Sequence, residues 1–92
     1  MKKIIEYMKT AEPFEACGFI LRSGIFVPLE NIADDRENSF EIDPTEWINR
    51  DVVALVHSHP GGLPYLSTAD REYQIDTGIE WWSVVGDEIL NY

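Results

Sequence analysis

Apolar residues recur along this chain with two different spacings, which separate predicted helices from predicted strands. Residues 2–11 carry apolar side chains at helical spacing and are followed by Pro13, so they predict a short amphipathic helix. Two β-prone runs come next, at 16–21 and 24–29. The tripeptide Arg22-Ser23-Gly24 lies between them and predicts a hairpin.

The middle of the chain is more polar until a continuous apolar run begins. Residues 39–42 alternate between polar and apolar and predict a short strand. Asp43 followed by Pro44 is typical of a helix start and predicts one or two helical turns. Residues 52–56 are all apolar, as expected for a strand that is covered on both faces. We expect this strand to lie at the centre of the sheet.

The last third of the chain predicts a loop, a helix and a second hairpin. Residues 60–64 read Pro-Gly-Gly-Leu-Pro and predict a loop. A helix is expected over 67–77, with Gly78 placed to end it. Residues 81–85 and 88–92 then predict two paired strands.

Length predicts one domain spanning residues 1–92, and the pattern of helices and strands predicts an α/β fold with a central mixed β-sheet flanked by helices. The longest apolar run is far too short to cross a bilayer, and the charged N-terminus does not read as a signal peptide. Cys17 is the only cysteine, which excludes an internal disulfide and a multi-cysteine zinc site. A cytoplasmic location is expected on these grounds.

The chain is strongly acidic, with a formal net charge of −10. Such a surface repels phosphate backbones and anionic membranes, so neither nucleic acid nor a membrane is expected as a partner. Seven acidic residues lie between Leu29 and Trp47, where Arg36 is the only base. They can be a solvated loop face, or a surface that selects basic partners.

The residues with the clearest chemical meaning are the only two histidines, His57 and His59. Residues two apart on a strand point the same way, so both imidazoles face one side. Asp70 falls near the start of the predicted helix, where exposed backbone amides favour its ionised form. Two histidines and one aspartate leave a tetrahedral zinc ion with one open position, which is the arrangement of a catalytic site.

The motif His57-Ser58-His59, followed after seven intervening residues by Ser67 and then Asp70, resembles that of the JAMM or MPN metallopeptidases. Glu15, in Glu15-Ala16-Cys17-Gly18-Phe19-Ile20, resembles the upstream acidic residue of that family. The resemblance implies a JAB/MPN-like fold with three layers, similar to that of the cytidine deaminases. It also implies that the two histidines and Asp70 bind Zn²⁺, that Glu15 acts as general base and then acid, and that Ser67 stabilises the oxyanion.

Within this family the chain resembles the N-terminal domain of phage tail assembly proteins and short prokaryotic JAB-domain proteins. The resemblance implies a zinc-dependent peptidase or isopeptidase with a protein or peptide substrate, in a bacterial host or in a virion. It also implies a tail-assembly or cysteine-peptidase partner chain. Two alternatives remain open: cleavage of a ubiquitin-like or sulfur-carrier protein tail, and a metal-stabilised scaffold or interaction module without turnover.

Each candidate residue also has an ordinary explanation. Ser67 and Asp70 form a capping box, the two histidines can be hydrogen-bonded loop residues, and Glu15 can be an exposed turn residue. One metal explains all five positions together. A thiol nucleophile at Cys17 paired with a histidine is a rival, but a cysteine in an apolar strand is expected to be inert. The aromatic residues are expected to be core and edge residues rather than a binding platform; they are Trp47, Tyr73, Trp81 and Trp82.

Overall fold

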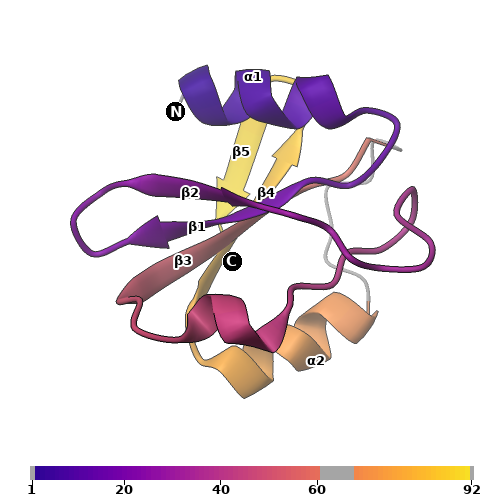
Figure 1. Ribbon diagram of the computed structural model, residues 1–92. Helices are drawn as coiled ribbons and strands as arrows, with labels where there is room; N and C mark the ends of the chain where they lie inside the picture. The colour runs from indigo at the N-terminus through magenta and orange to yellow at the C-terminus, as the bar shows by residue number, and fades with distance from the viewer. Residues whose placement is uncertain (1, 61–67, 92) are drawn as a thin grey trace.

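A five-stranded mixed sheet forms the middle of three layers in the computed structural model, which describes residues 2–60 and 68–91 (Figure 1). In chain order the elements are α1 (Lys2–Ala11), β1 (Cys17–Leu21), β2 (Phe26–Leu29), the 3-10 helix η1 (Pro44–Trp47), β3 (Val52–Ser58), α2 (Thr68–Thr77), β4 (Glu80–Val85) and β5 (Glu88–Asn91). Helix α1 lies on one side of the sheet, and α2 and η1 lie on the other. The predicted α/β fold with helices flanking a mixed sheet is confirmed.

The strands are ordered β2-β1-β3-β4-β5, so β3 is the central strand, as the sequence predicts. It pairs antiparallel with β1 and parallel with β4. The hairpins β1–β2 and β4–β5 complete the two sides of the sheet. Because β3 is covered from both sides, residues 54–58 are all buried. This strand therefore places the two histidines at one end of the sheet.

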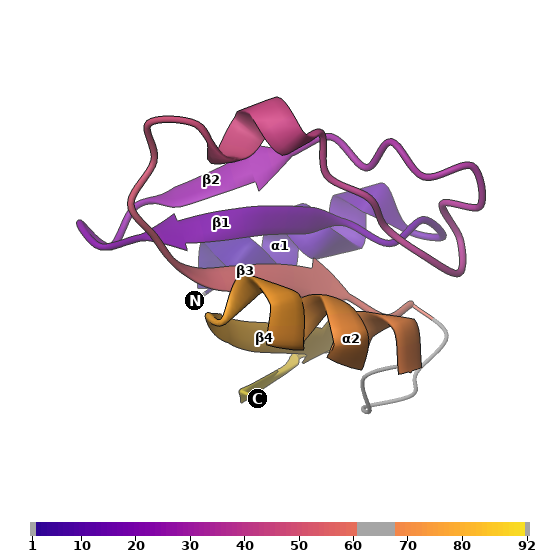
Figure 2. The same cartoon turned by 90° about the horizontal axis from the view of Figure 1, so that it is seen from below.

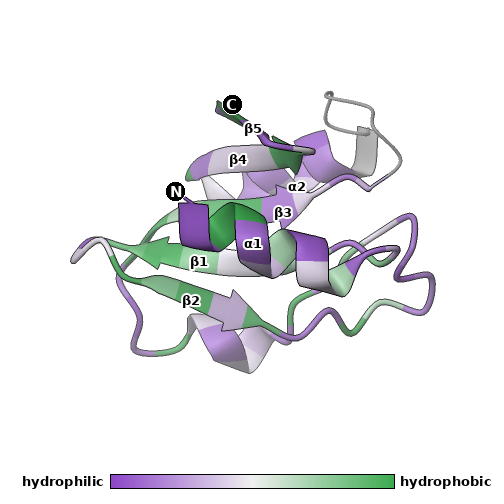
Figure 3. Cartoon of the chain, turned by 90° about the horizontal axis from the view of Figure 1, so that it is seen from above, coloured by the Kyte–Doolittle hydropathy of each residue, from purple (hydrophilic) through white to green (hydrophobic). Residues whose placement is uncertain are grey.

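Side chains that alternate along the strands build a separate core on each face of the sheet. Under α1 the core includes Ile4, Met8 and Val56, and Figure 3 shows the helix lying across the sheet with apolar strand residues beneath it. On the opposite face Leu55 and Trp81 pack with residues of the segment between β2 and β3. Figure 2 shows this second face, covered by α2 and η1.

The helix boundaries follow the signals in the sequence. Asp43 caps η1 by accepting a hydrogen bond from the backbone N–H of Thr45 at 3.0 Å. Helix α2 ends before Gly78, whose φ of +67° lies in the left-handed region that favours glycine. Both predicted helix signals are confirmed.

The strand predicted at residues 39–42 is wrong. Phe40 and Ile42 are buried, as the alternation suggests, but the segment joins no strand ladder. Its backbone is held instead by Asn31, whose Oδ1 accepts from the N–H of Glu41 at 3.1 Å and whose Nδ2 donates to the carbonyl of Ser39 at 3.0 Å. The backbone N–H of Ile32 also donates to the carbonyl of Glu41 at 3.0 Å, so one side chain and one backbone bond hold the segment in place of a strand ladder.

Within the part of the chain that the structure describes, neither helix has the length and apolar character needed to cross a membrane.

Candidate metal centre

The two histidines lie at the end of β3, on the sheet face opposite α1. His57 is fully buried and His59, one residue beyond the strand, is partly exposed. Their Nε2 atoms are 2.7 Å apart. The strand geometry expected from the His-x-His spacing therefore brings both imidazoles to one point.

Asp70 reaches the same point from the first turn of α2. Its Oδ2 lies 3.7 Å from Nε2 of His57 and 3.6 Å from Nε2 of His59. A circle through these three atoms has a radius of about 2.0 Å, which is the length of zinc–nitrogen and zinc–oxygen bonds. The three ligands predicted from the sequence are thus brought together, and they form a group that fits one metal ion.

Aromatic side chains fix the plane of the His57 ring. Phe40 stacks on it with centroids 5.0 Å apart and an interplanar angle of 25°, and Trp81 meets it at 5.4 Å and 68°. Burial, and then the neighbouring His59, lower the pKa of His57 to about 3. Burial also lowers the pKa of His59, against the opposing effect of Asp70. At neutral pH both rings are neutral, which is the form that binds a metal.

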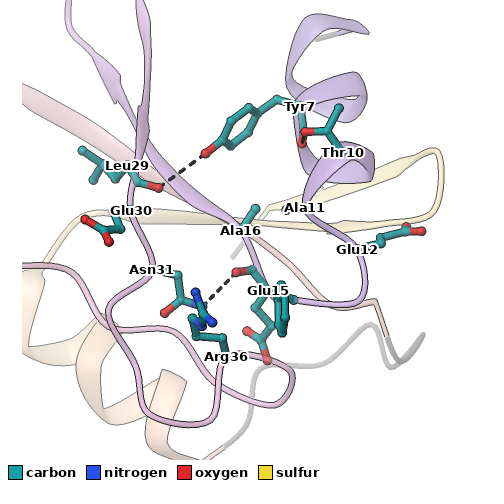
Figure 4. Close-up of a pocket in the computed structure, with 11 residues that line it drawn as sticks. Tyr7, Thr10, Ala11, Glu12, Glu15, Ala16, Leu29, Glu30, Asn31 and Arg36 are labelled. Atoms are coloured by element: carbon teal, nitrogen blue, oxygen red, sulfur yellow. Dashed lines mark hydrogen bonds between the residues drawn. The ribbon is translucent and has the colours of Figure 1, made fainter.

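Glu15 precedes β1 and is only 5% exposed. Its backbone N–H donates to the carbonyl of Arg36 at 2.6 Å, and its carbonyl accepts from Asn31 Nδ2 at 2.8 Å (Figure 4). The next residue, Ala16, is tied to β3 by two hydrogen bonds with Ser58, which lies between the histidines. These bonds position Glu15 beside the histidine pair.

The side chain of Glu15 is buried, and burial of a carboxylate costs free energy unless hydrogen bonds or opposite charges offset it. Its Oε1 has no hydrogen-bond partner among the described residues. Burial, followed by the charges of Asp70 and Asp35, raises the pKa of Glu15 to about 7. The effect of the Asp70 charge on this pKa means that Glu15 interacts electrostatically with one of the candidate metal ligands. A carboxyl group that titrates near neutral pH is suited to transfer protons.

Glu15 also lines an open groove of about 310 Å³. The groove lies between the C-terminal end of α1 and the segment that follows β2, with Tyr7 and Asn31 on its walls (Figure 4). Arg36 is a further lining residue, and its guanidinium lies 4.7 Å from the ring centroid of Phe14. The Glu15 residue therefore borders a groove that is open to solvent on this side of the molecule.

The raised pKa of Glu15 predicts that Glu15→Gln makes the metal-free protein more resistant to unfolding at alkaline pH. The folded protein favours the protonated carboxyl, so its stabilising contribution is present below the unfolded pKa and is lost as the pH rises through about 7. The gain from glutamine should be under ~1 kcal/mol at pH 5 and ~3 kcal/mol at pH 8. Urea unfolding of both proteins in a chelator measures it.

A matched control for that measurement is Glu6→Gln, which changes an exposed carboxylate on α1. Its stability should stay within ~0.5 kcal/mol of the parent at both pH values. A Glu15→Gln effect that is the same at pH 5 and pH 8 would mean that the Glu15 carboxyl is not raised in pKa.

Cys17 does not provide a nucleophile. It pairs in register with His57 across β1 and β3, but it is fully buried and faces the apolar core. Burial, and then the charge of Glu15, raise the pKa of its thiol to about 12. The thiol is therefore un-ionised at neutral pH and inert, as expected from its apolar sequence context.

Ser67, the predicted oxyanion residue, lies outside the described residues. Several residues that support the site have no signal in the sequence. Asn31 holds both Glu15 and the 39–42 segment, and Phe40 stacks on His57 across a long sequence separation. Trp81 was expected in the core, but its contact with the histidine was not.

Comparisons with known proteins agree with this fold. A family model described as prokaryotic homologues of the JAB domain matches residues 1–89. The solution structure of protein DSY2949 from Desulfitobacterium hafniense superposes with a TM-score of 0.74 at 21% sequence identity. The match covers 99% of this chain and 75% of that one, and it establishes the fold.

A curated relative gives a second comparison. Tail tip assembly protein K of Escherichia phage lambda is 49% identical over 47 residues. The match covers 47% of this chain and 24% of the phage protein, so the chain corresponds to a small part of that protein's length.

Proposed function

Because this chain belongs to the family of prokaryotic homologues of the JAB domain, we propose that it is a zinc-dependent peptidase or isopeptidase. The proposal is carried by one observation: His57, His59 and Asp70 each present a ligand atom, and these atoms all lie within 4.8 Å of one another. The family includes metalloproteases of the JAMM type, so hydrolysis of an amide bond is the reaction proposed.

The donor set suits zinc. Two neutral imidazoles and one carboxylate are the ligands of a zinc site that leaves one position for solvent or substrate. A zinc ion held there would polarise a carbonyl group and make water a stronger acid. The burial of His57 and its aromatic neighbours keep this ligand in one orientation.

Glu15 is the proposed proton carrier. Its pKa of about 7 allows its carboxylate to accept a proton from water and then to give it to the leaving amine. A buried carboxylate oxygen without a hydrogen-bond partner among the described residues has a stability cost that a purely structural role does not explain. Ser67 is proposed to donate a hydrogen bond to the oxygen of the scissile carbonyl.

The substrate is proposed to be a protein or peptide segment that enters along the groove beside Glu15. Glu12 and Glu30 line this groove, and the chain as a whole is acidic. This field favours a basic or neutral polypeptide and opposes nucleic acid. The similarity to tail tip assembly protein K supports a role in processing a protein during phage tail assembly, together with a tail-assembly or cysteine-peptidase partner.

Removal and return of zinc tests the proposal. Purified protein should cleave members of a panel of linear and branched peptides, lose this activity after dialysis against a metal chelator, and regain it when one equivalent of zinc is added. Full turnover by the chelated protein, with its zinc content verified as zero, would contradict the proposed metal dependence.

A further inference from the structure

Two polar atoms near the histidine pair are buried without a hydrogen-bond partner among the described residues: Nδ1 of His57 and Oγ of Ser83. His57 on β3 and Ser83 on β4 are register partners in the parallel pair, and both are fully buried. Register partners point to the same face of a sheet from strands ~4.8 Å apart. The hydroxyl therefore lies beside the imidazole.

The orientation of the His57 ring leaves Nδ1 on the far side from the metal ligands. Nε2 faces His59 and Asp70, while Phe40 and Trp81 fix the ring plane. A hydrogen-bonding interaction with the backbone of Trp82, next to Ser83, raises the pKa of His57 against the larger effect of burial, and this backbone is the competing partner for the ring. A group on β4 thus lies next to the ring, although Nδ1 does not complete a hydrogen bond there.

We propose that Ser83 is a positioning residue for His57, whose Oγ accepts a hydrogen bond from Nδ1–H and holds the tautomer that presents a free Nε2 to the metal. Histidines that bind metals generally donate their second N–H to such a partner, which fixes the tautomer and the ring orientation. This inference rests on the proposed metal site but does not depend on peptidase activity.

The first test compares zinc affinity with metal-free stability in Ser83→Ala. The variant should bind zinc 10–100-fold more weakly than the parent, measured by competition with a chromophoric chelator. Its resistance to urea in a chelator should be no higher than that of the parent, because the buried Nδ1–H of His57 loses its proposed acceptor. Ser83→Thr keeps the oxygen and should restore zinc affinity to within ~3-fold of the parent.

The second test needs neither metal nor substrate. Long-range ¹H–¹⁵N correlation of the metal-free parent should show His57 as the Nδ1–H tautomer, and Ser83→Ala should show a mixture of tautomers. The inference is overturned by a parent that carries the proton on Nε2 of His57, or by a Ser83→Ala protein with the parent's tautomer and zinc affinity. The second result would assign the Nδ1–H to the backbone of Trp82.

Discussion

Glu15→Gln should lower the rate of amide hydrolysis ~10²–10⁴-fold while the protein keeps its zinc. Glutamine has nearly the shape of glutamate, so the hydrogen bonds of the Glu15 backbone to Asn31 and Arg36 remain. The variant cannot accept a proton from water or return one to the leaving amine. Initial rates on the best peptide substrate, together with elemental analysis of zinc, measure both parts of this result.

Glu6→Gln is the matched control for the activity measurement, because Glu6 is exposed on α1 and does not line the groove. It should cleave at the parent's rate. Turnover by Glu15→Gln equal to that of the parent would remove Glu15 as the base. This comparison also separates an enzyme from a metal-stabilised scaffold, because a scaffold needs ligands but no base.

Asp70→Ala should lose zinc binding and, with it, the stabilisation that zinc gives to the parent. At a free zinc concentration 100 times the dissociation constant, binding contributes ~2.7 kcal/mol, which raises the melting temperature of a domain of this size on the order of 10 °C. The variant keeps two imidazoles but lacks the carboxylate 3.6–3.7 Å from them. It also lacks an acidic group in the first turn of α2, which favours the helix.

Differential scanning calorimetry with and without added zinc, joined to metal analysis, tests this expectation. Asp76→Ala changes an exposed carboxylate on the same helix and should retain the zinc-dependent rise in melting temperature. If Asp70→Ala contained one zinc ion per chain and melted like the parent, the third ligand would have to be another residue.

The sequence predicts most of the fold because its strongest signals are local. The continuous run at 52–56 identifies the central strand, and the His-x-His spacing at its end gives both imidazoles the same direction. The placement of Asp70 in the first turn of a helix follows from capping chemistry and is also confirmed. Spacing within one element, or at an element's end, is therefore sufficient to predict that these three candidate ligands lie together.

The features that escaped prediction depend on contacts between distant segments. Residues 39–42 alternate between buried and exposed, but hydrogen bonds from the Asn31 side chain hold their backbone outside any strand ladder. The burial of Glu15 depends on bonds of its own backbone and that of Ala16 to Asn31, Arg36 and Ser58. From the sequence alone, a glutamate at a turn is expected to be exposed. Its burial, and the raised pKa that burial causes, follow only from the folded structure.

Anomalous diffraction at the zinc absorption edge, from crystals grown with zinc, tests the metal centre most directly. We expect one strong peak at about 2.0–2.2 Å from Nε2 of His57, Nε2 of His59 and a carboxylate oxygen of Asp70. No peak between these three atoms, with the side chains turned apart in protein saturated with zinc, would contradict the metal site on which the proposed hydrolysis depends.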